Sequence, residues 1–302
     1  HHHKRGIFIT HAEHAPDHYP YHYYVPHHSY WPTIASFGLF TLMFGGATLL
    51  NGGSNTLLLI GLALILITMF GWFGTVIRES EKKMYSDQMD RSFRWGMSWF
   101  IFSEVMFFAA FFGALFYART YSVPWLGGES EHATFTHGML WPKFEAIWPT
   151  NGPGTVGGFF APMHAWGLPA INTLILLSSG ATITWAHWGL VEGRRAQLVK
   201  GLAATVALGV LFLVCQAAEY HEAYKELNLT LGSGIYGSTF FMLTGFHGLH
   251  VTIGAIILTV ILLRSMAGHF TPQRHFAFEA AAWYWHFVDV VWLGLFIFVY
   301  WM

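Results

Sequence analysis

The stretch GIYGSTFFMLTGFHGLHVTIGAIILTVILL, residues 234–263, contains no Asp, Glu, Lys or Arg. A helix needs about 20 mainly apolar residues to cross the hydrocarbon core of a bilayer, and this stretch is longer than that. Backbone polar groups in hydrocarbon must be paired within a helix or a closed barrel, and a barrel strand would show only about ten alternating residues. The stretch therefore predicts a transmembrane helix.

The rest of the chain is also rich in apolar residues and poor in charged ones. Hydrophobic residues make up 54% of the sequence and charged residues 10%, whereas a soluble domain carries about 25% charged residues. We therefore expect an all-α integral membrane protein with seven transmembrane helices. Their expected ranges are 33–50, 56–77, 93–118, 166–189, 200–219, 234–263 and 279–301.

Three regions are expected along the chain. Residues 1–32 form a polar, His-rich arm without the apolar core of a signal peptide, and residues 33–92 hold the first two spans and a loop. Residues 93–302 hold the other five spans and a long loop at 119–165. Because Gly-Gly, Trp-Pro and Gly-Pro pairs interrupt that loop, we expect an ordered extramembrane segment with no span of its own.

The Lys and Arg residues predict the orientation. They fall mostly on one side of the expected membrane, with the N-terminus: Lys4, Arg5, Arg78, Lys82, Lys83, Arg91, Arg94, Arg194, Arg195, Lys200, Arg264 and Arg274. Only Arg119, Lys143 and Lys225 lie on the opposite side. The positive-inside rule then places the N-terminus in the cytoplasm and the C-terminus outside. No basic cluster of the kind that binds nucleic acid is visible.

Glu104 is the first candidate functional residue. It lies in FIFSEVMFF, residues 100–108, about 16 Å into the expected span. A carboxyl group near the middle of the bilayer is costly and marks a functional site. We expect a proton-exchanging or gating group; the alternative is a protonated acid hydrogen-bonded to a neighbouring helix.

Other polar residues favour structural roles. His247 and His250, and likewise His286 and Asp289, are spaced i, i+3 and share a helix face. Hydrogen bonds between helices, with Gly245 and Gly248 permitting close packing, are a simpler interpretation than metal or haem ligation. The lone Cys215 excludes a disulfide framework. Glu219, His221 and Glu222 end an expected span, so we expect them at the interface and solvated; no metal site is predicted.

Polar residues also gather where spans end on the Lys- and Arg-rich side. Trp72, Arg78 and Glu79 close the second span, and Arg264 and His269 follow the sixth. An Arg at an interface binds a lipid phosphate by charge-assisted hydrogen bonds, although simple anchoring is the alternative.

An ordered series of short motifs resembles subunit III of cytochrome c oxidase from about residue 25 onward. The motifs are VIRES (76–80), SEV (103–105), ITWAH (183–187), YGSTFF (236–241), GFHGLHV (245–251), FEA (278–280) and WYWHFVDVVW (283–292). Any one of them is weak evidence, but the ordered set is highly specific.

This resemblance implies a fold and a role. The family's seven helices form two groups, helices 1–2 and 3–7, in a V whose cleft holds phospholipids. Its lipid-contacting positions match Trp72, Arg78, Glu79, Arg264 and His269, and its carbodiimide-reactive carboxyl matches Glu104. Phe73 stands where one family pattern has a second Trp, which removes a hydrogen-bond donor.

The resemblance also implies partners. Subunits I and II hold the haem and copper, receive electrons from cytochrome c, reduce oxygen to water and pump protons. This chain then has no catalytic residue and no redox cofactor; it supports proton uptake and the stability of subunit I, and lipids in its cleft guide oxygen. The long loop favours a bacterial inner membrane.

Two rival functions stay open at this point. One is subunit III of a quinol-oxidising haem–copper oxidase, although those forms lack the first two helices. The other is a proton-coupled transporter that uses Glu104; the lack of internal repeats weighs against it. A purely structural assembly subunit would differ only in the role of Glu104.

Overall fold

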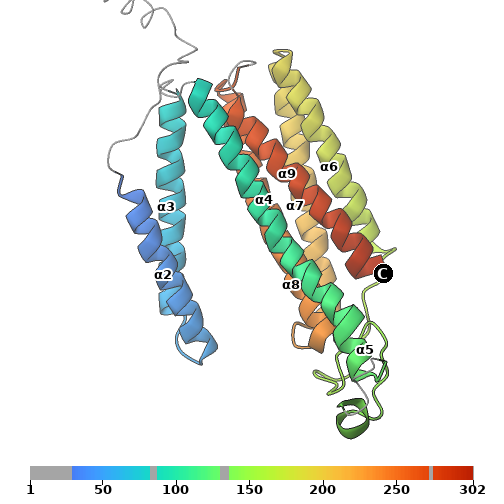
Figure 1. Cartoon of the computed structure of the whole chain (residues 1–302). Coiled ribbons are helices and arrows are strands. Elements are labelled where there is room, and N and C mark those ends of the chain that lie inside the picture. The colour runs from blue at the N-terminus through green and yellow to red at the C-terminus, as the bar shows by residue number, and fades with distance from the viewer. Residues whose placement is uncertain (1–28, 82–86, 130–135, 272–274, 302) are drawn as a thin grey trace, which may run out of the picture. The chain divides into compact units, whose positions relative to one another are not determined.

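The computed structural model describes the chain except for residues 1–28, 82–86, 130–135, 272–274 and 302 (Figure 1). It divides into two compact units, His1–Trp95 and Gly96–Met302. Most of the expected polar arm at 1–32, together with Lys82, Lys83 and Arg274 of the orientation pattern, lies outside the described residues.

Seven helices are long and apolar enough to cross a membrane, and the described residues contain no strand, which confirms the predicted fold class. The long helices are α2 (Trp31–Leu50), α3 (Thr56–Glu81), α4 (Asp87–Tyr117), α6 (Leu168–Val191), α7 (Arg195–Lys225), α8 (Gly234–Met266) and α9 (Phe276–Leu295). A π-helix, η3 (Phe296–Trp301), continues α9. The V-shaped lipid cleft stays a prediction.

Several helices extend beyond their expected ends. The helix α7 runs from Arg195 to Lys225, whereas the expected span is 200–219. After α4 the helical backbone continues through η1 (Ala118–Ser122) and α5 (Val123–Leu126), so the long loop starts at Gly127 and contains a short π-helix, η2 (Thr136–Leu140). Hydropathy locates the hydrocarbon core, but helical hydrogen bonds continue past it into the polar interface.

In the first unit, α2 and α3 form a tight antiparallel hairpin (Figure 1). A turn at Asn51 and Gly52 joins them, and Gly52 has a φ of +86°, which favours glycine. A β-carbon at Gly45 would collide with the backbone at Leu58, and one at Gly61 with the backbone at Leu42. Glycine thus lets these two backbones approach closely, as in other membrane helix pairs.

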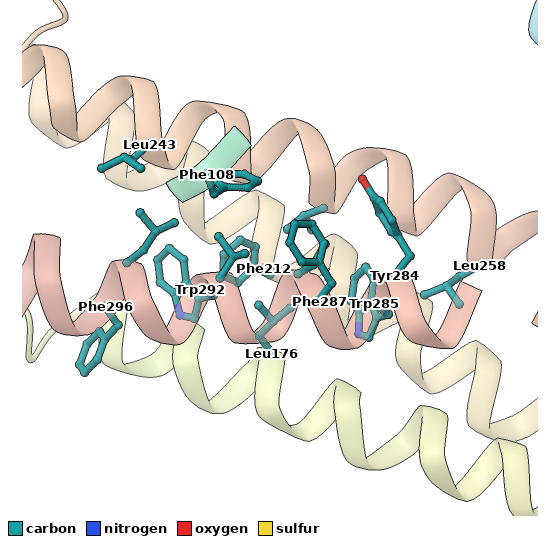
Figure 2. Packing of buried hydrophobic residues seen from close by; sticks show 14 of the residues in the cluster. Phe108, Leu176, Phe212, Leu243, Leu258, Tyr284, Trp285, Phe287, Trp292 and Phe296 are labelled. Atoms are coloured by element: carbon teal, nitrogen blue, oxygen red, sulfur yellow. The ribbon is translucent and has the colours of Figure 1, made fainter. Parts of the chain in front are cut away.

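In the second unit, α6 packs against α7 and α9, and α8 packs against α7 and α9. The helix α4 joins this bundle through large aromatic side chains. Ring centroids are 5.1 Å apart between Phe107 and Phe246 of α8, and 6.0 Å apart between Phe108 and Phe287 of α9. The resulting core is centred on α9 (Figure 2).

Two tryptophans of α9 connect this core to α6. The Nε1–H of Trp285 donates to Ser179 Oγ at 2.8 Å, and that of Trp292 donates to Thr173 Oγ1 at 3.0 Å. Both indoles are at least 99% buried, and Figure 2 shows them among Phe212, Leu176 and other apolar side chains. Each buried N–H therefore has the partner that burial requires.

The expected role of two glycines is wrong. Among the described residues, no atom beyond the chain neighbours and the nearby backbone of α8 lies within 4 Å of a β-carbon built at Gly248, and only Tyr220 Oη lies near Gly245, at 3.7 Å. Close packing occurs elsewhere on α8, at Gly254, where a β-carbon would lie 3.0 Å from the ring of Trp285. Glycine alone does not say which face of a helix meets a neighbour.

Candidate functional site

Glu104 of α4 meets His250 of α8. The distance from Glu104 Oε2 to His250 Nε2 is 2.6 Å, short even for a charge-assisted hydrogen bond. The side chain of His250 is 10% exposed and that of Glu104 is 24% exposed. The geometry therefore contains the hydrogen bond to a neighbouring helix that the alternative interpretation of Glu104 expected, whereas the proton-exchanging role stays a prediction.

The hydrogen bond at the other ring nitrogen of His250 limits the protonation states of the pair to two. His250 Nδ1 is 2.6 Å from the carbonyl oxygen of Phe246, one turn earlier on α8. A carbonyl oxygen only accepts, so Nδ1 carries a hydrogen, and Nε2 and the Glu104 carboxyl then share one further proton between them. The pair is either an imidazolium with a carboxylate or an imidazole with a carboxylic acid.

Aromatic rings surround this pair. The centroid of the His250 ring lies 4.9 Å from that of Phe108 and 6.3 Å from that of Tyr284, which it stacks on. Phe107 lies on another side, at 6.0 Å. These rings lower the local dielectric and keep water away from the imidazole, which strengthens the bond to Glu104.

The five lipid-binding candidates are divided between the two units. In the first unit Trp72 and Arg78 are exposed, and Glu79 is half-buried. Arg78 Nη2 donates to Thr75 Oγ1 at 3.3 Å, one turn earlier on α3.

In the second unit Arg264 and His269 do come together, because Arg264 Nε donates to His269 Nδ1 at 3.2 Å. The guanidinium also lies over the ring of Phe270, 4.6 Å from its centroid, and Arg264 is only 8% exposed. A guanidinium only donates, so His269 Nδ1 accepts and the imidazole is neutral with its hydrogen on Nε2. This arrangement holds the arginine in a fixed position at the end of α8.

Comparison with known proteins identifies the family. A sequence profile described as "Cytochrome c oxidase subunit III" matches residues 19–131 and 130–302. The chain is 42% identical over 294 residues to cytochrome c oxidase subunit 3 of Formosania lacustris, covering 97% of this chain and 99% of that protein. The protein of the same name from Marchantia polymorpha is 45% identical over 288 residues, covering 94% and 96%. That of Dugong dugon is 40% identical over 294 residues, covering 97% and 99%.

The chain belongs to the cytochrome c oxidase subunit III family. Members of this family are subunits of a multi-subunit oxidoreductase, so the chain works in a complex with other oxidase subunits. The resemblance drawn from the motifs is thereby confirmed. A bacterial source stays a prediction, since the relatives named above include animals and a plant.

His247 forms a hydrogen bond between helices, and Asp289 and His286 lie on the side of α9 that faces α6. His247 Nε2 lies 2.9 Å from the carbonyl oxygen of Val288, which joins α8 to α9. Asp289 faces α6, where its Oδ2 would lie 2.6 Å from a β-carbon built at Gly180, and His286 Nδ1 lies on the same side at 4.0 Å. The prediction of interhelical hydrogen bonding is confirmed for His247.

The expected exposure of Glu219 is wrong. Because α7 continues to Lys225, Glu219 is not at the helix end but inside the bundle, with no exposed surface. Tyr300 of η3 donates its hydroxyl hydrogen to Glu219 Oε2 at 2.9 Å, and Gln216 lies one turn earlier on α7, buried as well. His221 is exposed, as expected.

The structure also brings together a group that the sequence did not single out. His187 near the end of α6, His275 just before α9 and Glu279 in the first turn of α9 have ligand atoms within 4.8 Å of one another. Within the described ranges no other group of three His, Cys, Asp or Glu residues meets that criterion. The i, i+4 spacing of His275 and Glu279 is a visible signal, but His187 is too distant in sequence to join it.

Proposed function

We propose that this chain is the non-redox core subunit III of a proton-pumping cytochrome c oxidase. In this proposal subunits I and II hold haem and copper and transfer electrons from cytochrome c to oxygen. This chain supports proton uptake by subunit I, prolongs the active life of the complex, binds phospholipids and offers oxygen a lipid-lined route. Its place is the inner membrane of a bacterium, with the N-terminus in the cytoplasm.

One observation carries the proton-related part of the proposal, namely the contact between Glu104 and His250. A proton moves between atoms 2.6 Å apart without any movement of the backbone. The imidazole is held by Phe246, whereas the carboxyl group keeps 24% of its side-chain surface exposed. We infer that the proton enters or leaves through that exposed side of Glu104, and that His250 stabilises whichever form remains.

Two features support a lipid-binding role. Arg264 is held between His269 and Phe270, so its guanidinium loses less conformational freedom when it binds a phosphate. Trp72 presents an amphipathic ring with 40% of its surface exposed on α3, and such rings lie at the level of lipid headgroups. Arg78 and Glu79 complete the proposed set.

The test is Glu104→Gln in the intact oxidase. Glutamine keeps the size of the side chain and one acceptor oxygen, but it does not share a proton with His250. We expect a several-fold shorter active life during turnover, or less proton uptake per electron, with an unchanged KM for cytochrome c.

The matched control is Glu145→Gln, which changes an exposed carboxyl group of the long loop. It should behave as the unmodified enzyme does. Unchanged rate, pumping and lifetime in the Glu104→Gln enzyme would reject the proton-related role and leave a structural subunit.

A further inference from the structure

Two ends of the second unit's helices meet at a cluster that the proposed function does not use. His187 lies in the last two turns of α6, and its ring packs on Phe278 of α9, with centroids 5.5 Å apart. His275 precedes α9, and its ring centroid is 5.6 Å from that of His187. Glu279 follows His275 by one helical turn, which brings its carboxyl group to the same side.

The cluster is well shielded from water. His275 is 9% exposed, the side chain of Glu279 is 17% exposed, and His187 is half-buried. Buried imidazole and carboxylate groups that converge on one point are the donor set of many metal sites.

The hydrogen bonds of His275 identify which of its nitrogens faces the cluster. Its Nδ1 lies 2.9 Å from the carbonyl oxygen of Thr271 and its Nε2 lies 2.8 Å from Glu279 Oε1. The carbonyl only accepts, so Nδ1 carries a hydrogen, and Nε2 is the nitrogen that faces Glu279. A backbone carbonyl holding the outer N–H of a ligating histidine is the usual support of a metal site.

His275 faces an acceptor oxygen at each of its ring nitrogens, the Thr271 carbonyl at Nδ1 and the Glu279 carboxylate at Nε2. Because the hydrogen of a neutral imidazole is already on Nδ1, a positive charge is needed between Nε2 and the carboxylate. A proton satisfies this need by making an imidazolium–carboxylate pair, and a metal ion satisfies it as well. The nearby second imidazole favours a metal ion, because an ion pair needs only His275 and Glu279 whereas His187 supplies a metal with a third ligand.

We propose that His187, His275 and Glu279 bind a zinc ion that joins the end of α6 to the start of α9. Zinc bonds of about 2.0–2.2 Å place tetrahedral ligand atoms about 3.4 Å apart. The three ligand atoms, now within 4.8 Å of one another, reach that spacing by small side-chain rotations. Two nitrogens and one oxygen suit zinc better than calcium or magnesium, which prefer oxygen alone.

The fourth ligand is a water molecule. The site lies apart from Glu104 and His250, which are on α4 and α8, so this inference does not depend on the proposed proton role. Its physical consequence is a cross-link between two helix ends that are far apart in sequence.

The test uses the intact oxidase, stripped with a chelator, given zinc and dialysed. Elemental analysis then counts zinc separately from iron and copper. We compare the unmodified complex with His187→Gln and with Glu279→Gln, each of which removes one ligand while keeping a side chain of similar size. We expect each variant to hold one equivalent of zinc less, or to bind that equivalent at least about tenfold more weakly.

The matched control is His221→Gln, which removes an exposed histidine from the far end of α7. It should retain the full zinc content. X-ray absorption at the zinc edge of the unmodified complex gives a readout that needs no variant, and it should show two imidazole nitrogens and one carboxylate oxygen.

Three results would overturn the inference. They are no zinc uptake by the unmodified complex, the same content and affinity in both ligand variants, and a coordination shell of three or more imidazoles. The last would assign the zinc to the His-rich arm at 1–32 and leave His275 and Glu279 as an ion pair only.

Discussion

Glu104 and Glu219 are both carboxyl groups within helices, but their surroundings differ. Glu104 has a basic partner, His250, and keeps part of its surface exposed. Glu219 is completely buried, has a tyrosine hydroxyl on one oxygen, and forms no ion pair within the part of the chain that the structure describes. A charge without a partner is very costly at such a place, so we expect Glu219 to be a neutral, structural acid.

Substitutions at Glu219 test that expectation. Glu219→Gln keeps an acceptor for Tyr300 and introduces no charge, so it should lower the free energy of unfolding by less than about 1 kcal/mol. Glu219→Leu leaves the buried hydroxyl of Tyr300 without its acceptor and should cost about 1–3 kcal/mol. Thermal unfolding of the purified complex measures both.

A loss from Glu219→Gln as large as about 3 kcal/mol would contradict a neutral Glu219, because glutamine differs from a protonated glutamate mainly in being unable to carry a negative charge. Glu145→Gln is the control, because Glu145 is exposed and lies outside α7. Glu222 is less suitable, because it is half-buried and lies one turn from Glu219 on α7.

At the scale of single residues, the sequence predicts candidates better than partners. The position of Glu104 within an apolar span is enough to mark it as a functional candidate. Its partner His250 is 146 residues away, and Tyr300 is 81 residues from Glu219, so neither contact follows from local spacing. The same limit hides His187, the third member of the cluster with His275 and Glu279.

At the scale of helices, glycine positions decide how closely two backbones approach. Gly45 of α2 and Gly61 of α3 each face the backbone of the other helix, and a β-carbon at either place would collide with it. Gly74, also on α3, has no atom of another described element within 4 Å of such a β-carbon. Replacing Gly61 or Gly74 by alanine changes the helix propensity of α3 in the same way, but only the replacement at Gly61 disturbs the packing against α2.

Gly61→Ala should destabilise the hairpin by about 1–3 kcal/mol, because the added methyl group pushes α2 and α3 apart. Gly74→Ala should be neutral or stabilising by up to about 1 kcal/mol, because alanine favours a helix. The measurement is the thermal transition of the purified chain in detergent. A Gly61→Ala protein as stable as the Gly74→Ala protein would contradict the close approach.

The sequence predicted the existence of all seven long helices but not their ends. Each span is recognisable by itself, since about 20 apolar residues suffice, whatever the neighbours do. The ends of α4 and α7 lie in polar sequence where helix and loop have similar hydropathy. Glu219 is buried because α7 continues past residue 219. Placing the end of this helix at residue 219 therefore led to the wrong expectation that Glu219 is solvated.

At the scale of the whole molecule, the proposed lipid-binding role is tested in the second unit by itself, at Arg264 and His269. We expect the double substitution Arg264→Ala with His269→Ala to reduce the phospholipid retained by the purified complex, because Arg264 loses its charge and its support together. Mass spectrometry of the extracted lipid measures the change. Arg194→Ala is the control, because it removes an exposed arginine between α6 and α7. Equal lipid in all three proteins would reject the site.

The central proposal is that this chain is a subunit without redox centres in a cytochrome c oxidase. The most direct measurement is gentle detergent purification through this chain, followed by mass-spectrometric identification of every protein that accompanies it. We predict a haem–copper subunit I and a copper-bearing subunit II in equal amounts. Recovery of the chain alone, under conditions that keep other membrane complexes intact, would show that it does not work in an oxidase.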